Sequence, residues 1–516
     1  MDKKTPLDEL RFRRAQARLG GGEKRIAKQH AQGKLTARER LSKLLDPDSF
    51  EEIGSLATHH IHEFGMEKKK YPGDGVVTGF GTIEGQRVAV YAQDFTVFGG
   101  SFSEMQANKI SRLLDLARES GIPFIGLIES GGARIQEGVR GLAGYGRLFT
   151  RNVLASGVIP QIAVVMGPAA GGSVYSPALM DLIIMVDKTS YMFLTGPDVI
   201  KTVTGEEVTF EELGGARVHN EKSGVAHFIA PDEEQALDLV KRILSYLPPN
   251  NAEMPPRAQP VAPTAAELEE LNHIIPEQED EAYDVHDVIR RIFDPGSFLE
   301  VQAHFARNVV VGFARLDGWP VGIVANQPAY LAGVLDIDGS DKIARFVRLC
   351  DAYNLPVITF IDCPGFLPGV DQEHGGIIRH GAKVVYAYVE ATVPKISLVL
   401  RKAIGGAYIA MSSKEMRTDL ALAWPTAQIA TMGAEGAVRI LYRRELAEAD
   451  DPERLKRHFE AEYKEAILNP FVAAELFYID EVIEPRETRS RLVRALRVLR
   501  GKVQTNPPKK HGLMPV

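Results

Sequence analysis

The chain has 516 residues, of which 45% are hydrophobic, so it is long enough to bury sizeable cores in about two to four domains. Its formal net charge of −7 argues against a protein that binds nucleic acid through bulk charge. The two cysteines, Cys350 and Cys363, exclude a disulfide framework and indicate a reducing compartment, so we expect a cytoplasmic protein. No apolar core follows the basic N-terminus, and no secretory signal is predicted.

Residues 8–45 predict two basic helical segments separated by Gly20, Gly21 and Gly22. Thr36 is a candidate N-cap, with Glu39 three residues later. Residues 1–45 hold 13 Lys and Arg against 5 Asp and Glu, a local charge of +8. Two interpretations stay open: a solvated basic face, or a surface that attracts a polyanion such as a coenzyme phosphate.

The next segments alternate between strand and helix patterns. Residues 76–98 predict two strands, Ser103 to Ser120 a helix, and residues 122–128 a short buried strand that ends in ESGGAR. Residues 152–180 carry no charge and are long enough to span a bilayer. We reject a span, because three prolines and a glycine pair would break a lipid-exposed helix.

That glycine pair, Gly171 and Gly172, is the first candidate site. Glycines at a helix start let a ligand approach the backbone N–H groups, which is the geometry of an oxyanion hole. The alternative is that they only allow tight packing of a helix against a strand. Gly405 and Gly406 repeat the pair at an offset of 405 − 171 = 234.

The repeat extends along the chain. Residues 248–265 contain six prolines and predict a linker between domains at 1–247 and 266–516. Lys109 aligns with Lys342, and Glu129 with Asp362, at one offset of 342 − 109 = 233. The sequence therefore predicts two similar α/β domains.

Each half ends a buried strand in a glycine turn, which indicates a ligand site at the carboxyl end of the strand. Two backbone nests suggest two polarised carbonyl groups, and hence activation of a thioester or of a carboxylated carrier without a protein base. Other kinds of site have weaker support in the sequence. They are a nucleophilic thiol at Cys363 with His374 or His380 as its base, hydroxyl groups at Ser173 or Ser176, and a metal site at His59, His60 and His62.

Several motifs occur in order along the chain: GDGVVTGFG at 73–81, DFTVFGGSFSE at 94–104, ESGGARIQEG at 129–138, GPAAGGSVYSPAL at 167–179, MFLTGPDVIKTVTGEEV at 192–208, RKAIGGAYIAM at 401–411 and AWPTAQIATMGAEGAV at 423–438. With them the chain resembles the biotin-dependent acyl-CoA carboxyltransferases, most closely the β subunits of propionyl-CoA carboxylases. The resemblance implies tandem crotonase-like domains built from ββα superhelix units. It also implies a homohexamer in which the N-domain of one chain faces the C-domain of another.

The resemblance assigns roles to individual positions. Gly171 and Gly172 would hold the thioester carbonyl of the acyl-CoA, and Gly406 and Ala407 the ureido oxygen of carboxybiotin. The substrate-binding positions that it implies are Gly131, Gly132 and Ala133 for coenzyme A, and Gly365, Phe366, Tyr408 and Ile409 on the biotin side. In the family, biotin delivers CO2, its ureido anion takes the α-proton, and the enolate attacks CO2. No metal is implied.

The implied function is transfer of a carboxyl group from carboxybiotin, carried on a partner subunit, to a short acyl-CoA such as propionyl-CoA. The expected partner is a biotin carboxylase and biotin carrier subunit; no nucleic acid and no membrane insertion are expected. Ile409 departs from the acidic residue common in propionyl-specific members, which leaves acyl length and reaction direction open. The alternatives are the α subunit of a sodium-pumping methylmalonyl-CoA decarboxylase and a non-catalytic acyl-CoA-binding scaffold.

Overall fold

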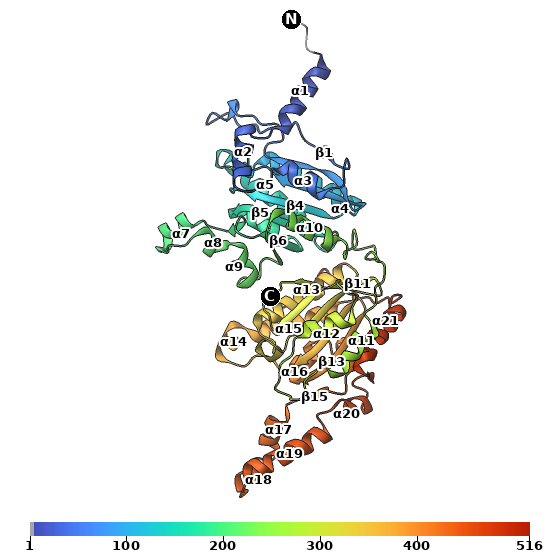
Figure 1. Cartoon of the computed structure of the whole chain (residues 1–516). Helices are drawn as coiled ribbons and strands as arrows, with labels where there is room; N and C mark the ends of the chain where they lie inside the picture. The colour runs from blue at the N-terminus through green and yellow to red at the C-terminus, as the bar shows by residue number, and fades with distance from the viewer. Residues whose placement is uncertain (1–4) are drawn as a thin grey trace. The chain divides into compact units, whose positions relative to one another are not determined.

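The computed structural model describes residues 5–516. Contacts within the chain divide it into two compact units (Figure 1). The first ends at Met254 and the second begins at Pro255. We refer to them as unit 1 and unit 2. Among the described residues, every helix is too short or too polar to cross a membrane.

Unit 1 is built on a mixed sheet. Its strands are β1 (Glu51–Ile53), β2 (Val76–Ile83), β3 (Gln86–Gln93), β4 (Phe124–Ser130), β5 (Gln161–Ala170), β6 (Leu182–Val186), β7 (Tyr191–Phe193) and β8 (Phe228–Ala230). They lie in the order β1-β2-β3-β4-β5-β6-β8, and β7 pairs with the end of β5. The pairs β1·β2 and β2·β3 are antiparallel, and from β3 onward all pairs are parallel.

Unit 1 also contains helices, some of which pack against its sheet. They are α1 (Pro6–Arg18), α2 (Glu23–Ala31), α3 (Ala37–Leu44), α4 (Glu104–Ser120), α5 (Val139–Ala155), α6 (Tyr175–Leu179), α7 (Pro197–Thr204), α8 (Phe210–Gly214), α9 (Ala216–Glu221) and α10 (Glu233–Leu244), with 3-10 turns η1 (Met66–Lys68), η2 (Phe98–Gly100), η3 (Ile135–Glu137) and η4 (Gly171–Val174). Apolar residues of α4 and α5 form one buried core with those of the central strands. The segment α7–α9 extends away from the sheet (Figure 1).

Unit 2 repeats the arrangement. Its strands are β9 (Leu299–Val301), β10 (Val309–Leu316), β11 (Trp319–Asn326), β12 (Val357–Cys363), β13 (Lys395–Ile404), β14 (Leu420–Ala423), β15 (Gln428–Ala430) and β16 (Glu481–Val482). Their order is β16-β14-β13-β12-β11-β10-β9, and β15 pairs with the end of β13.

The helices of unit 2 pack in the same way. They are α11 (Ala265–Glu270), α12 (Val285–Ile292), α13 (Ile337–Ala352), α14 (Val370–Gly375), α15 (Ile377–Glu390), α16 (Gly405–Ala410), α17 (Ala434–Leu441), α18 (Arg443–Glu448), α19 (Pro452–Ala466), α20 (Pro470–Glu475) and α21 (Thr488–Leu499), with 3-10 turns η5 (Leu271–His273), η6 (Leu331–Gly333), η7 (Lys414–Met416) and η8 (Pro485–Glu487). Apolar residues of α12 and α21 share one core with the strands. The segment α17–α19 extends away from that core (Figure 1).

The duplication holds at the level of strand boundaries. The residue numbers at the two ends of β11 exceed those of β3 by 319 − 86 = 233 and 326 − 93 = 233. Those of β13 exceed those of β5 by 395 − 161 = 234 and 404 − 170 = 234. The register shift between β4 and β5 after Ile128 recurs between β12 and β13 after Ile361. The predicted fold class, two similar α/β domains in tandem, is confirmed.

A buried lysine marks each unit at the duplicated position. Lys109 donates from Nζ to the carbonyls of Gly73 at 3.0 Å and Val76 at 2.5 Å. Lys342 donates to Gln302, Phe305 and Val309 carbonyls at 2.9, 2.8 and 2.7 Å. Burial lowers the pKa of Lys109 to about 8 and that of Lys342 to about 7. Each lysine thereby fixes the loop that precedes the first long strand of its own unit.

The predicted separation at Gly20, Gly21 and Gly22 is confirmed, since α1 ends at Arg18 and α2 begins at Glu23. The prediction of one helical segment after it is wrong, because the structure has two helices there, α2 and α3. The additional break follows α2, where Gly33 has a positive φ of 72° that helices do not tolerate. The cap at Thr36 is confirmed, since Thr36 and Glu39 bond each other's backbone N–H. The strand predicted at 122–128 begins at Phe124 and extends to Ser130.

The proline-rich stretch joins the two units in sequence. It holds no helix or strand between the end of α10 and Ala265, where α11 begins. Thr264 caps α11 by accepting from the Glu267 N–H. Residue 265, the last of the predicted linker, is therefore helical.

Candidate functional site

A glycine turn follows β4 in unit 1. Gly132 has a φ of 96°, and a methyl group placed on it would lie 3.3 Å from the Ala170 carbonyl, at the end of β5. The Gly131 N–H donates to the Gly99 carbonyl at 2.9 Å. Ala133 forms a bridge with Phe102. The predicted turn residues thus lie beside the strand end from which the first glycine pair starts.

The acid before this turn, Glu129, is fully buried and bonds to the N-terminal segment. Its carboxylate contacts Lys34 Nζ at 2.5 Å and Arg40 Nη1 at 2.7 Å, and it accepts from the Gln29 amide at 3.0 Å. Arg40 also pairs with Glu233. Part of the basic segment is therefore a structural anchor for the turn, a role that no pattern in the sequence indicated.

The first glycine pair lies at the start of η4. Gly171 has a φ of 60°, which favours glycine. A methyl group on Gly172 would lie 2.8 Å from the Tyr145 ring, so only glycine fits there. The first N–H groups of a helical turn have no acceptor within the turn, and they are available to a ligand oxygen.

The second pair starts α16, and Gly405, with a φ of 64°, corresponds to Gly171. A methyl group on Gly406 would touch nothing outside its own helix. Ala407 is buried, with 1% of its surface exposed, whereas Ile409 is 41% exposed. The residues that correspond to Gly171 and Gly172 are therefore Gly405 and Gly406, one position before the implied pair of Gly406 and Ala407.

A buried acid also precedes the turn of unit 2. Asp362 accepts from Arg401 Nε at 3.0 Å and from the Lys402 N–H at 3.0 Å. Burial raises the pKa of Asp362, and Arg401 opposes this shift. The Gly365 carbonyl accepts from the Leu335 N–H at 3.0 Å, and Phe366 forms a bridge with Leu335. This turn is therefore held by the same kinds of backbone contact as its counterpart in unit 1.

Tyr408 supplies a polar group beside the second pair. Its side chain is 9% exposed, and its hydroxyl has no hydrogen-bond partner within residues 5–516. Burial raises the pKa of Tyr408 to about 12. The group is thus a neutral hydroxyl, able to bond a ligand oxygen or nitrogen.

Hollows lie beside elements of both units. A hollow of about 300 Å³ in unit 1 is lined by Arg25, Lys28, Gln29, Gln32, Phe95, Thr96, Phe98 and Gly99. One of about 550 Å³ in unit 2 includes Pro364, Lys402 and Ile404, next to the second pair. Another hollow in unit 2, of about 620 Å³, surrounds His286 and Glu300 and is lined by none of the predicted site residues.

The alternative chemistries gain no support. Burial raises the pKa of Cys363 to about 12, so the group is a thiol, and its Sγ donates to the Gly365 carbonyl at 3.3 Å. His380 pairs with Asp341 instead. His59 bonds the Lys69 carbonyl, and no group of three or more potential metal ligands occurs in the part of the chain that the structure describes. What both units share is a set of backbone donors.

Comparisons with known proteins show the family of the chain. The family model described as carboxyl transferase domain matches residues 28–514. The propionyl-CoA carboxylase carboxyltransferase subunit of Haloferax mediterranei is 57% identical over 99% of both chains. The methylmalonyl-CoA decarboxylase α subunit of Propionigenium modestum is 51% identical, also over 99% of both.

A solved structure gives the same result in three dimensions. Transcarboxylase 12S, reported as a hexamer with methylmalonyl-coenzyme A and methylmalonic acid bound, superposes with a TM-score of 0.96 at 51% identity. The match covers 100% of this chain and 99% of that one. The chain therefore belongs to the carboxyl transferase domain family.

Proposed function

We propose that the chain is the carboxyltransferase subunit of an acyl-CoA carboxylase, which moves a carboxyl group from carboxybiotin to the α-carbon of propionyl-CoA and yields methylmalonyl-CoA. The observation that carries this proposal is the pair of glycine nests, one in each unit, built at duplicated strand ends. A transfer between two carbonyl-containing substrates needs two such nests, whereas a scaffold that only binds acyl-CoA needs one.

In this proposal unit 1 takes the acyl-CoA and unit 2 takes carboxybiotin. Gly171 and Gly172 donate to the thioester oxygen, with Gly131, Gly132 and Ala133 along the coenzyme. These donors favour the enolate, whose charge lies on that oxygen.

On the other side, N–H groups at the start of α16 suit the ureido oxygen of carboxybiotin, which accepts hydrogen bonds. We place Gly365, Phe366 and Tyr408 around this group. Carboxybiotin supplies the carboxyl group and, after losing it, a nitrogen that accepts the α-proton. The chain itself then needs no general base.

Biotin is proposed to be carried by a separate biotin carboxylase and carrier subunit, and the chain to act in the cytoplasm as a homohexamer. The two cysteines are free and buried, as in proteins of reducing compartments. The hexamer rests on the similarity to transcarboxylase 12S.

Affinity purification from native cells tests the assignment. We expect a biotinylated partner to co-purify and the 56.7 kDa chain itself to give no streptavidin signal. A polytopic membrane partner in place of a biotin carboxylase would instead support the methylmalonyl-CoA decarboxylase, which the 51% identical relative keeps as the second candidate. A purified chain that transfers no carboxyl group between methylmalonyl-CoA and biotin would contradict both.

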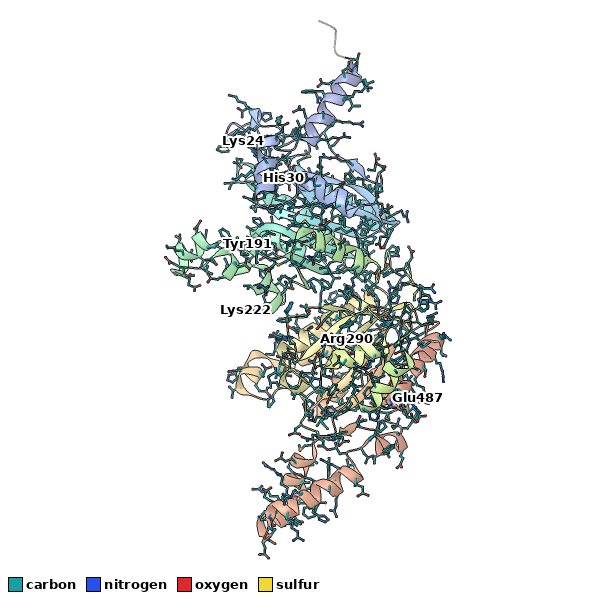
Figure 2. All side chains as sticks on the ribbon, in the orientation of Figure 1. Lys24, His30, Tyr191, Lys222, Arg290 and Glu487 are labelled. Carbon is teal, nitrogen blue, oxygen red and sulfur yellow. The ribbon has the colours of Figure 1, made fainter. Side chains whose placement is uncertain are left out.

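The hollow beside η2 suits the phosphates of coenzyme A. Arg25 and Lys28 lie three residues apart on α2, so they share one face, and Gln32 is the C-cap of that helix. Arg25 also donates to the Thr96 carbonyl at 3.0 Å. Lys24 and His30 lie on the same helix (Figure 2). Neither residue lines the hollow.

We expect Arg25→Ala and Lys28→Ala each to raise the KM for propionyl-CoA about two- to fivefold at low salt, with kcat nearly unchanged, since an exposed ion pair is worth about 0.2–1 kcal/mol. Propionyl-pantetheine, which lacks the nucleotide, should show no difference between these variants and the wild type. Lys24→Ala serves as the matched control. An equal loss with both substrates would exclude a nucleotide contact.

Ile409 is proposed to contact the acyl chain from the biotin side, next to the second nest, and so to set acyl preference, because its aliphatic side chain is exposed. Ile409→Asp should lower kcat/KM for acetyl-CoA and butyryl-CoA more than for propionyl-CoA, by up to about tenfold in the ratio, since one methylene discriminates by about 1–3 kcal/mol. At 41% exposure an aspartate there should leave the Tm unchanged. Ile440→Asp, at a 65% exposed position of α17, is the control. Equal losses for all three thioesters would remove Ile409 from the specificity site.

A further inference from the structure

Three hydroxyl groups form a chain beneath the first glycine pair. Tyr145 Oη lies 2.7 Å from Ser173 Oγ, and Ser173 donates to Ser130 Oγ at 3.1 Å. The Gly132 N–H donates to the same Ser130 oxygen at 3.3 Å. The three side chains come from α5, η4 and β4, so one hydrogen-bonded chain connects the glycine turn with the glycine pair.

The Tyr145 ring strengthens this connection. It lies against the backbone of Gly172, where a methyl group would approach it to 2.8 Å. It also stacks on Phe102, with ring centroids 4.1 Å apart and an angle of 14°. The Phe102 N–H in turn donates to the Gly132 carbonyl at 2.8 Å. Tyr145 therefore touches the glycine pair and the residue that supports the turn.

Unit 2 shows that the fold does not require these hydroxyls. Ser130 corresponds to Cys363, since 363 − 130 = 233, and Ser173 corresponds to Ala407, since 407 − 173 = 234. Both strand pairs keep the same register in the two units. The hydroxyl chain is thus a feature of the unit 1 site alone.

The hydroxyl chain supports the structure around it through hydrogen bonds. Burial raises the pKa of Tyr145 to about 12, although the Ser173 hydrogen bond lowers it. The phenol stays neutral near pH 7, and it acts through hydrogen bonding. Ser130, Ser173 and Tyr145 are all at least 94% buried, so water does not compete for these bonds.

We propose that Tyr145 and Ser173 are positioning residues, which hold the N–H groups of Gly171 and Gly172 at the geometry that polarises the thioester carbonyl. This inference rests on the proposed function of that glycine pair. An oxyanion hole works only when its donors are fixed before the charge develops, and a small displacement lowers the rate without weakening ground-state binding.

The test compares Tyr145→Phe and Ser173→Ala with Tyr388→Phe. Tyr388 is a matched control, because its hydroxyl is also fully buried and lies 2.8 Å from Thr359 Oγ1, between α15 and the middle of β12. The measurements are kcat and KM for propionyl-CoA, and the infrared carbonyl frequency of bound [1-13C]propionyl-CoA. Tm is recorded for each variant.

We expect Tyr145→Phe and Ser173→Ala to lower kcat about tenfold with less than about a twofold change in KM, because donors are displaced and not removed. The red shift of the bound carbonyl should shrink in both variants and stay at its wild-type value in Tyr388→Phe. If Tyr145→Phe does not fold, Ser173→Ala decides, since Ala407 shows that alanine fits the corresponding place.

A wild-type red shift and kcat in Ser173→Ala would overturn the inference. So would losses in Tyr388→Phe equal to those in Tyr145→Phe, which would mean general destabilisation. If the wild-type chain itself produced no red shift, the proposed function of the glycine pair would fail first, and this inference with it.

Discussion

Ala407→Pro should lower the rate of carboxyl transfer about 100- to 1,000-fold while acyl-CoA binding stays nearly unchanged. Ala407 is the third residue of α16, so its N–H belongs to the first turn and has no acceptor within the helix. Proline removes this donor, and loss of one oxyanion donor typically costs a factor of that size. Acyl-CoA is proposed to bind in unit 1, which the substitution does not touch.

The comparison variant is Ala407→Gly, which keeps the N–H. Single-turnover transfer from methylmalonyl-CoA to biotin measures the rate, and calorimetry with propionyl-CoA measures binding. Circular dichroism and the hexamer fraction show whether the proline variant folds and assembles. Normal turnover in a folded Ala407→Pro hexamer would mean that the second nest is structural and that the two-site proposal is wrong.

Glu129→Ala should lower the free energy of unfolding by about 3–5 kcal/mol, because it leaves buried cations without their anion. The side chains of Lys34 and Arg40 are 8% and 1% exposed, and only Arg40 retains another acid, Glu233. Leaving a buried charge unpaired lowers the free energy of unfolding more than losing an exposed ion pair does. The turn that follows Glu129 should lose its fixed position as well, so activity falls together with stability.

Glu52→Gln is the control, since the pair of Glu52 with Arg38 is partly exposed, at 20% and 27%. We expect it to cost less than about 1 kcal/mol. Denaturant midpoints at one protein concentration give the comparison, because assembly adds to apparent stability. Equal midpoint shifts in the two variants would contradict the anchor role of Glu129.

The duplication was the part of the fold most visible in the sequence. One offset linked Lys109 with Lys342 and Glu129 with Asp362, and the structure keeps that offset at the ends of β3 and β4. Local capping chemistry was also predictable, as at Thr36. Both signals depend on residues close in sequence or on copies of one pattern, which a single chain displays.

Partners distant in sequence were not predictable. Arg40 meets Glu129 and Glu233 through tertiary packing, and its helix gave only a basic amphipathic pattern. No sequence pattern indicated the contacts of Tyr145 with Gly172 and Ser173, because these residues meet only in the folded chain. Gly33 has a left-handed φ just after α2 ends. A single glycine within a basic segment does not show from the sequence that it will take this φ.

The two buried lysines, Lys109 and Lys342, have an evolutionary consequence. Within residues 5–516, Lys109 and Lys342 donate to carbonyls of their own unit, and each nest lies at strand ends of one sheet. Mutations in one half can therefore accumulate without disturbing the loops of the other. A lineage of such chains can therefore change the loops of one half while the other half keeps its structure.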